Sequence, residues 1–298
     1  MTNAKFSTPL GHDGREILQH GTPLFPCATY SRDIHQFIAG EIIPHWHQEV
    51  EIFLLDEGRV HITLMDQAFD LRSGEGYFIN SNILHGILCR SDTPCRYRSI
   101  VFDPAIVSGP PGSAFDLLYV RPFLEQGAPV WLFQSGSPYD VSVLTGHFNA
   151  AYQACEEKPA GYEFFVRDAL SHILLLLREP HQPLSRKPEN QQEVRMKQML
   201  SWLDAHFGEP ITIARLAGVA NICVRECQRS FSNLLHSSPM QYVARRRVSA
   251  AAELLISTDL PILEIGLRCG LENPSYFTKQ FKEITGMTPS EYRKRIAQ

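Results

Sequence analysis

The spacing of hydrophobic and polar positions predicts a β-rich first third of the chain. Between residue 1 and about residue 105, short alternating or wholly apolar runs are separated by turn residues, as at 56–58 and 72–76. Several short strands at this spacing are typical of a β-sandwich or a small barrel. The strands that we predict are Phe37–Ile38, Val50–Leu55, Val60–Leu64, Gly76–Ile79 and Tyr97–Phe102.

The middle of the chain is predicted to hold two helices after an irregular stretch. Residues 103–137 are rich in proline and glycine, and helical periodicity then favours helices near Tyr139–Cys155 and Tyr162–Glu179. The second helix has a wide apolar stripe, which core packing and a dimer seam explain equally well. The stripe consists of positions 164, 165, 169, 170, 173, 174, 176 and 177.

In the last third, one pattern occurs twice after a helix predicted from about residue 194 to residue 207. Each copy has a short apolar helix, a tight turn and a longer helix whose outer face is polar and basic, which is typical of a helix-turn-helix. The first copy covers Thr212–Ala217 and Cys223–Phe231, and the second covers Ile262–Gly266 and Asn273–Phe281. The sequence therefore predicts a tandem DNA-reading module.

Capping residues predict a long helix between the two copies. Ser238 and Gln241 form a capping-box pattern around Pro239, and the helix that they open runs to about Ser257. About 19 residues at ~1.5 Å each span about 28 Å, close to the roughly 34 Å between successive major-groove faces. We therefore expect both recognition helices to enter adjacent turns of one groove. Further capping positions are Gly270, Asn273 and Thr288–Glu291.

Charge separates the two parts of the chain. The 298 residues carry a net charge of -4, but residues 191–298 hold 14 Lys and Arg against 10 Asp and Glu, whereas residues 1–190 hold 14 against 22. The basic last third is therefore the DNA candidate. No apolar run reaches the about 18 residues of a membrane span. Seven scattered cysteines and no apolar core at the N-terminus indicate a cytoplasmic protein with reduced thiols.

Residues 194–296 resemble the DNA-binding domain of the AraC/XylS family of bacterial transcription regulators. The resemblance implies a sequence-specific regulator and not an enzyme. It also implies a homodimer that activates a metabolic operon with RNA polymerase and responds to a small-molecule effector such as a sugar. The positions that carry the resemblance are Leu216-Ala217, Gln228–Phe231, Ser238–Tyr242, Arg247–Ala251, Leu254-Leu255, Glu264-Ile265, Gly270, Ser275–Phe277, Phe281 and Gly286–Pro289.

By this resemblance, three positions on each recognition helix face double-stranded promoter DNA. The residue types agree, because Arg pairs with guanine, Gln pairs with adenine, and Ser, Thr and Lys contact bases or phosphates. A merely solvated helix face is the alternative. The six residues are Arg225, Gln228, Arg229, Ser275, Thr278 and Lys279.

The connecting helix carries three consecutive arginines with different expected roles. By the resemblance, Arg247 is a structural residue that packs and forms ion pairs, whereas Arg245 or Arg246 contacts phosphate.

Three positions depart from the family pattern. Cys223 replaces an N-cap Ser, His236 replaces a Gly in a left-handed turn, and Gly266 replaces a packing Ala. Cys223 and Cys227 lie one helical turn apart, but they have no complementary ligands, so packing is favoured over a redox or metal pair.

A second group of chemically capable residues lies in the β-rich part. His45, His47 and Glu51 occupy odd positions and would share one face of a strand, and His85 stands near the start of a later apolar run. Three His and one Glu that converge inside a barrel would suit Fe, Mn, Ni or Zn.

Over roughly residues 35–102 this spacing resembles the cupin motif, from which Asn80 and Asn82 depart. In AraC-type regulators such a domain usually lines an effector pocket without a metal. We therefore expect His45, His47, Glu51 and His85 to bind a small-molecule effector, with no catalytic residue, cofactor or metal. A bound metal, a purely structural barrel, and a metal-dependent cupin enzyme fused to a DNA-binding module are the alternatives.

Other residues of the same region are expected to play smaller parts. Trp46 is out of phase and should pack outside the barrel, whereas Tyr77 and Arg98 are weaker pocket candidates. Five other histidines have no partner at ligand spacing: His12, His20, His35, His147 and His181.

These patterns together predict an α+β multidomain fold. A cupin-like β-barrel with a helical connector, whose helices lie at about 139–179, makes an effector-binding and dimerisation domain over residues 1–180. A polar, proline-containing linker is predicted at 181–192. An all-α domain with two helix-turn-helix motifs is predicted over residues 193–298.

Overall fold

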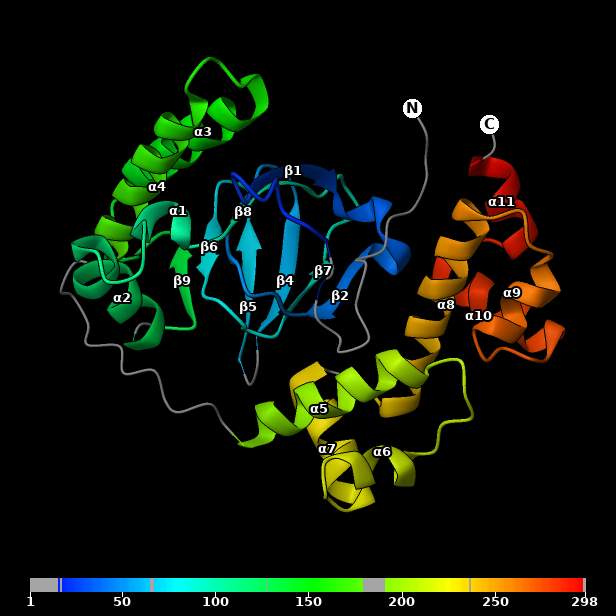
Figure 1. Cartoon of the computed structure of the whole chain (residues 1–298). Helices are drawn as coiled ribbons and strands as arrows, with labels where there is room; N and C mark the ends of the chain where they lie inside the picture. Colours follow the sequence, from blue (N-terminus) through cyan, green and yellow to red (C-terminus); the bar gives the residue numbers. More distant parts are fainter. Residues whose placement is uncertain are drawn as a thin grey trace.

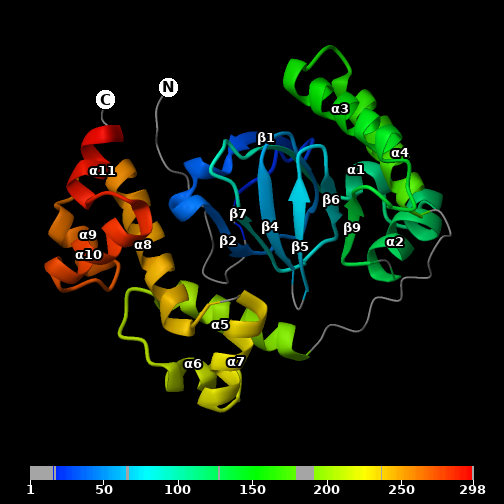
Figure 2. The ribbon, with the colours of Figure 1, turned by 180° about the vertical axis from the view of Figure 1, so that it is seen from behind.

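The computed structural model describes residues 16, 18–64, 67–126, 128–178, 191–235 and 237–296. Two β-sheets lie at the centre, two long helices lie on one side of them, and the C-terminal helices form an arc around the opposite side and below (Figure 1, and from behind in Figure 2). A β-rich N-terminal part and a helical C-terminal part confirm the predicted fold class.

The two sheets are antiparallel and face each other without closing into one hydrogen-bonded barrel. The five-stranded sheet has the order β1 (Cys27–Asp33), β8 (Arg96–Phe102), β3 (Val50–Leu55), β6 (Gly76–Ile79) and β9 (Val130–Phe133). The four-stranded sheet has the order β2 (Glu41–His45), β7 (His85–Cys89), β4 (Arg59–Leu64) and β5 (Gln67–Arg72).

Apolar side chains fill both faces of the five-stranded sheet. Its inner face meets the smaller sheet, and there Phe53 stacks between Tyr77 and Tyr97 with ring centroids 4.8 and 4.9 Å apart. Its outer face carries Ile52 and Ile100, which pack with the long helices beside it. All six residues of β3 are buried, because this strand is covered on both sides.

The strand predictions were right where a strand is buried on both faces. β3 and β6 have the predicted bounds, and β4 and β8 begin one residue earlier. The strand predicted at Phe37–Ile38 is wrong, because two 3₁₀ turns, η1 (Ile34–Gln36) and η2 (Ile38–Gly40), occupy that region. Phe37 is apolar because it joins the core between the sheets, and Ile38 because it packs against the C-terminal helices.

The prediction that residues 103–137 are irregular is also wrong. They contain α1 (Ala105–Ser108), a π-helical turn η3 (Asp116–Val120), α2 (Arg121–Gln126) and β9. Val120, Phe123 and Trp131 from these elements join the outer core, so tertiary packing holds short elements that lack a clear period of their own.

The two predicted helices exist within two residues of their expected bounds, as α3 (Val141–Glu157) and α4 (Tyr162–Arg178). Five of the eight stripe positions of α4 are buried in the core: Ala169, Leu170, Ile173, Leu174 and Leu177. Val166, outside the predicted stripe, is buried with them. Phe164, Phe165 and Leu175 lie outside that core and are 77%, 60% and 49% exposed.

The tandem helical pattern is confirmed in the C-terminal part. The first unit contains α5 (Gln191–His206), α6 (Ile213–Val219) and α7 (Val224–Leu235), and the second contains α9 (Ile262–Arg268), α10 (Pro274–Thr285) and α11 (Pro289–Ile296). The connecting helix α8 (Pro239–Ser257) contributes to the cores of both units. α5 begins three residues before its expected start. Residues 181–190 of the predicted linker lie outside the described part of the chain.

The predicted caps are present. Ser238 and Gln241 form a reciprocal capping box on α8, and Asn273 caps α10. Gly270 has a φ of 69°, as expected after a helix end, and Thr288 and Glu291 bond reciprocally. At Gly266 a Cβ atom would lie 2.9 Å from Cδ1 of Phe277, so the missing methyl group makes room for that ring.

A buried ion pair joins α5 to α8. Nε of Arg246 lies 2.5 Å from Oδ1 of Asp204, and the side chains are 8% and 0% exposed. The expected phosphate contact of Arg246 is therefore wrong. Arg247 packs as expected, because it donates to the carbonyls of Phe207 and Glu209 at 2.7 Å.

We expect Arg246→Ala to lower the free energy of unfolding by about 3–5 kcal/mol, because the Asp204 carboxylate would stay buried without its counterion. Urea denaturation of the full chain measures the loss. Arg268→Ala removes an exposed pair with Glu264 and is the control, with an expected cost of about 0–1 kcal/mol. Equal losses in the two variants would contradict the prediction.

Candidate effector pocket and DNA-binding face

The structure brings the four histidine and glutamate candidates together at one end of the space between the sheets. His45 ends β2 and stands opposite His85 at the start of β7, while Glu51 comes from β3 and His47 from the turn before it. All four line a cavity of about 150 Å³. The register of two neighbouring strands therefore assembles residues that lie up to 40 positions apart.

The four side chains are buried and close to one another. The ring centroids of His45 and His85 are 4.4 Å apart, and those of His47 and His85 are 5.3 Å apart. Oε2 of Glu51 lies 3.3 Å from Nε2 of His85 and 3.7 Å from Nε2 of His47.

Sequence reasoning missed two further members of this cavity. Oε2 of Glu16 lies 3.6 Å from Nε2 of His20 and 3.8 Å from Nε2 of His45. His20 also shares a hydrogen bond of 2.8 Å with the Tyr30 hydroxyl, so the expectation that His20 has no partner is wrong. Both residues precede the first strand, and no spacing rule connects them to the motif.

Backbone carbonyls fix the orientation of the three central imidazoles. Nδ1 of His45 donates to the Ile43 carbonyl at 2.9 Å, and Nδ1 of His85 donates to the Ile83 carbonyl at 2.8 Å. Nδ1 of His47 donates to the Glu49 carbonyl at 3.1 Å. A carbonyl only accepts, so each Nδ1 holds a proton, and Nε2 of each ring is turned toward the cavity.

The electrostatics of the cavity favour a ligand that donates hydrogen bonds or carries positive charge. Burial alone would raise the pKa of Glu51, but hydrogen bonds with His47 and His85 lower it overall, so the carboxylate is ionised at neutral pH. Burial, and then the neighbouring His85, lower the pKa of His45 to about 4, so this imidazole is neutral. Nε2 of His85 and of His47 both face this carboxylate, at 3.3 and 3.7 Å from Oε2.

The same donors also fit a divalent metal ion. Ligand nitrogens of His45, His47 and His85 lie within 4.8 Å of one another, and the Glu51 carboxylate lies beside them. Three imidazoles and one carboxylate suit borderline divalent ions such as zinc or iron, and carbonyls that hold Nδ1 are typical outer partners of metal-binding histidines.

Tyr77 and Arg98 do not belong to the pocket, contrary to prediction, whereas Trp46 lies where it was expected. Tyr77 is buried beside Phe53 and does not line the cavity. Arg98 lies on the outer side of its sheet, where Nη2 is 2.7 Å from Oδ1 of Asp56. Trp46 packs outside the sheets as expected, within the core of the first helix-turn-helix unit.

Outside the cavity, the structure reveals two cysteine pairs that sequence reasoning did not anticipate. Cys89 and Cys95 have sulfur atoms 2.7 Å apart, and Nε2 of His35 lies 3.4 Å from Sγ of Cys89. The expectation that His35 has no partner at ligand spacing is therefore wrong. Cys27 and Cys155 form a second, buried pair with sulfur atoms 3.8 Å apart.

The six residues expected to read DNA are all exposed. Arg225, Gln228 and Arg229 lie on α7, whose opposite face buries Cys227 and Phe231. The equivalent residues of α10 are Ser275, Thr278 and Lys279. α8 spans 19 residues between the two units, as the predicted groove geometry requires.

The cysteines of α7 agree with the packing interpretation. Cys223 is exposed, whereas Sγ of Cys227 is buried 3.7 Å from Sδ of Met199. His236 lies outside the described residues.

Comparison with known families agrees with this division of the chain. Residues 216–295 match the Helix-turn-helix domain family, and residues 36–102 match the Cupin domain family. No helix in the described part of the chain has both the length and the hydropathy to span a membrane.

Similar proteins align along most of the chain. The uncharacterised HTH-type transcriptional regulator YdeC of Bacillus subtilis is 27% identical over 94% of this chain and 96% of its own length. The probable transcriptional regulator LumQ of Photobacterium leiognathi is 22% identical over 84% of this chain and 91% of its own. The crystal structure of ToxT from Vibrio cholerae O395 aligns with a TM-score of 0.44 and 12% identity, covering 91% of this chain and 98% of that one.

The pKa of His45 predicts how stability depends on pH. The ordinary value is 6.5 and the folded value is about 4, so at pH 5 the unfolded chain binds a proton here that the folded chain does not. The free energy of unfolding should therefore fall by about 2 kcal/mol from this residue as the pH drops from 7 to 5.

His45→Gln should abolish this contribution and flatten the pH dependence by that amount. Urea unfolding of both proteins, in the presence of a chelator at each pH, measures the difference. Parallel curves for the two proteins would show that the folded imidazole is not held neutral.

Proposed function

We propose that a small polar effector in the cupin cavity controls how the two recognition helices bind promoter DNA. The chain is a DNA-binding transcriptional regulator of the AraC type, with a cupin domain ahead of its helix-turn-helix domain. The observation that carries the proposal is the position of the cavity residues. They alternate along the backbone with residues that pack into the DNA-binding domain.

Trp46 lies between His45 and His47, and Leu84 immediately precedes His85. Successive side chains of extended backbone point to opposite faces, so the imidazoles face the cavity while Trp46 and Leu84 face away from it. Trp46 and Leu84 are buried in the apolar core formed by α5, α6 and α7. A ligand that displaces an imidazole therefore also acts on the contact with the first recognition unit.

Polar contacts across the same boundary support this route. The amide of Asn82 donates to the His47 carbonyl at 2.8 Å, and its own carbonyl accepts from Nζ of Lys197 on α5 at 2.8 Å. Nη1 of Arg245 on α8 lies 3.1 Å from Glu41 at the start of β2, so this ion pair also joins the two domains. For control, the effector must bind the docked and the released arrangements with different affinity.

The cavity chemistry suggests the class of effector. The ionised Glu51 carboxylate and the neutral His45 imidazole accept hydrogen bonds, so a small ligand with several hydroxyl donors, such as a sugar, fits the charge and the volume of about 150 Å³.

The remaining roles are proposed from the family resemblance. The regulator would act in the cytoplasm as an activator of a metabolic operon, together with RNA polymerase. It would act as a homodimer, and the exposed Phe164, Phe165 and Leu175 of α4 are the apolar surface that supports this.

A second candidate is that a metal ion is the effector. The closeness of the ring nitrogens of His45, His47 and His85 to one another and to the Glu51 carboxylate supports it. The two candidates are distinguished by metal analysis of the purified protein and by titration with Zn²⁺ or Mn²⁺. Metal bound at one ion per chain, lost in a His45→Gln/His85→Gln variant and altering DNA affinity, would favour the metal.

We propose that Arg225, Gln228 and Arg229 read one half-site and Ser275, Thr278 and Lys279 read the next, about 10 base pairs away. Arg225→Ala should weaken binding to the specific site by about 1–3 kcal/mol, because an arginine pairs bidentately with guanine. Lys279→Ala should weaken it by a similar or smaller amount. Genomic fragments retained by the purified protein supply the site, and fluorescence anisotropy at fixed salt measures the affinity.

Arg96→Ala is the control for these variants, since it removes an exposed charge from the cupin domain and should leave affinity unchanged. Losses below about 1 kcal/mol in both helix variants would overturn the assignment.

Trp46→Ala tests the contact between the domains. Removal of this buried ring should raise the amide hydrogen exchange of α5 around Met196 and Leu200 by at least tenfold, corresponding to about 1.4 kcal/mol or more of lost local stability. Leu24→Ala, at a side chain that is 97% exposed, should change nothing. Unchanged exchange in α5 of the Trp46 variant would show that the domains are not held together in this way.

A further inference from the structure

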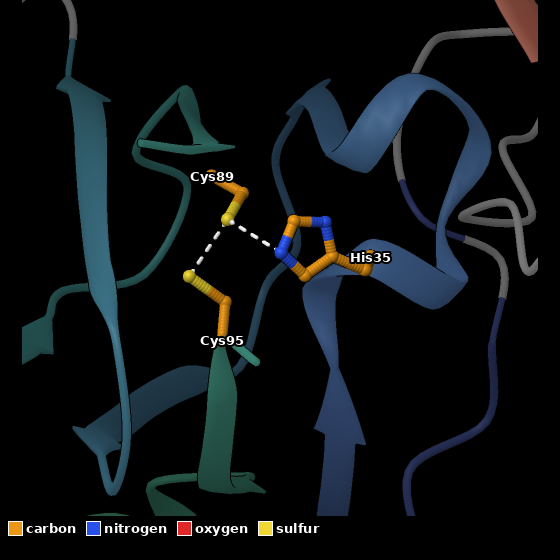
Figure 3. A group of neighbouring side chains, drawn as sticks. All are labelled: His35, Cys89 and Cys95. Atoms are coloured by element: carbon orange, nitrogen blue, oxygen red, sulfur yellow. Dashed lines mark hydrogen bonds between the residues drawn. The ribbon is translucent and has the colours of Figure 1, made fainter. Parts of the chain in front are cut away.

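Cys89, Cys95 and His35 form a cluster (Figure 3) at the end of β7 that is opposite to His85. Cys89 ends β7, Cys95 precedes β8, and His35 belongs to η1. Cys95 is fully buried, Cys89 is half-buried and His35 is exposed, so the cluster has one side open to solvent.

The distances favour a disulfide over a metal site. The two sulfur atoms are 2.7 Å apart. Two thiolates on one tetrahedral zinc ion, with bonds of about 2.3 Å, would be about 3.8 Å apart, whereas a disulfide bond needs about 2.05 Å. The pair is therefore closer to covalent bonding than to sharing a metal.

The surroundings make the two sulfurs chemically different. Nε2 of His35 lies 3.0 Å from the Thr93 carbonyl, which only accepts, so this nitrogen carries a proton that it also directs at Sγ of Cys89, 3.4 Å away. A proton donor beside a sulfur stabilises the thiolate. Each sulfur also donates to a backbone carbonyl, Cys89 to Ser91 at 3.4 Å and Cys95 to Arg59 at 3.2 Å. Only Cys89 has the imidazole beside it, whereas burial raises the pKa of Cys95 to about 12. Cys89 is thus the nucleophile and Cys95 the thiol that resolves it.

We propose that Cys89 and Cys95 are a reversible disulfide site that is oxidised by peroxides. The Cys89 thiolate attacks one peroxide oxygen, the O–O bond breaks, and the leaving oxygen takes up a proton to become water. The sulfur of Cys95 then attacks the sulfenic acid of Cys89, forms the S–S bond and releases a second water. Two thiols lose two electrons, and one peroxide is reduced to two waters.

The site is joined to a segment that contacts the second helix-turn-helix unit. The carbonyl of Cys95 accepts from the amide of Ile34 at 2.8 Å, and its amide donates to Oδ1 of Asp33 at 3.2 Å. Four residues later, Ile38 lies in the apolar core of the second unit, and Glu41 pairs with Arg245. We name residues 38–41 the docking segment. This segment closely follows Asp33 and Ile34, which Cys95 binds by hydrogen bonds, so oxidation should alter its contact with α8 and α10.

Peptide mapping of the full chain after brief exposure to hydrogen peroxide tests the site. We expect a Cys89–Cys95 linkage with a mass loss of two hydrogen atoms, reversed by a dithiol reductant. The pair Cys27 and Cys155 is the internal control and should remain reduced, because both residues are buried and their sulfur atoms are 3.8 Å apart. His35→Gln should slow formation of the linkage by about tenfold, because it removes the imidazole that lies 3.4 Å from Sγ of Cys89.

Cys95→Ser should leave Cys89 as a sulfenic acid that a dimedone probe captures. Hydrogen exchange of the docking segment should differ between the oxidised and reduced full-length protein. No Cys89–Cys95 linkage, equal oxidation of the control pair, or a stoichiometric zinc ion that protects both thiols would overturn the disulfide site. Unchanged exchange at residues 38–41 would overturn its connection to the DNA-binding domain.

Discussion

The packing of Trp46 and Leu84 into the first helix-turn-helix unit is the contact on which the functional arrangement depends. Each residue adjoins a histidine of the cavity, so one stretch of backbone has a ligand-facing side and a DNA-domain side. Burial of one large apolar side chain stabilises a protein by about 1.5–3 kcal/mol. Allosteric coupling free energies are typically about 1–3 kcal/mol. Rearrangement of a single such side chain is therefore enough to transmit an effector's binding energy.

The polar side chains of the cavity have fixed orientations and lie close to one another. Carbonyls orient three imidazoles, and an ionised carboxylate stands beside them in a buried space. Charged and hydrogen-bonding groups interact strongly in a low dielectric. A polar ligand that contacts the imidazoles or the carboxylate would therefore favour whichever domain arrangement holds these groups in place.

The DNA-binding domain contacts the cupin domain at two separate places. Trp46 and Leu84 pack on the first unit, while the docking segment packs on the second through Ile38 and Glu41. Within the domain, α8 and the buried Arg246–Asp204 pair hold the two units together. The effector cavity thus bears on one recognition unit and the thiol pair on the other, which allows two chemically different inputs to act on one DNA-reading surface.

The sequence by itself determined the elements whose order is local. The Ser238 and Asn273 caps, the buried strand Val50–Leu55 and the repeated helical pattern follow from residues within a few positions of one another. The His45, His47 and Glu51 spacing also predicted one shared cavity. Only the tertiary structure brought Glu16 and His20 to that cavity, placed Cys89 beside His35, and turned Arg246 inward to Asp204. These contacts join segments far apart in the chain. Strand register and helix packing create these contacts, and the local spacing of hydrophobic residues carries no information about them.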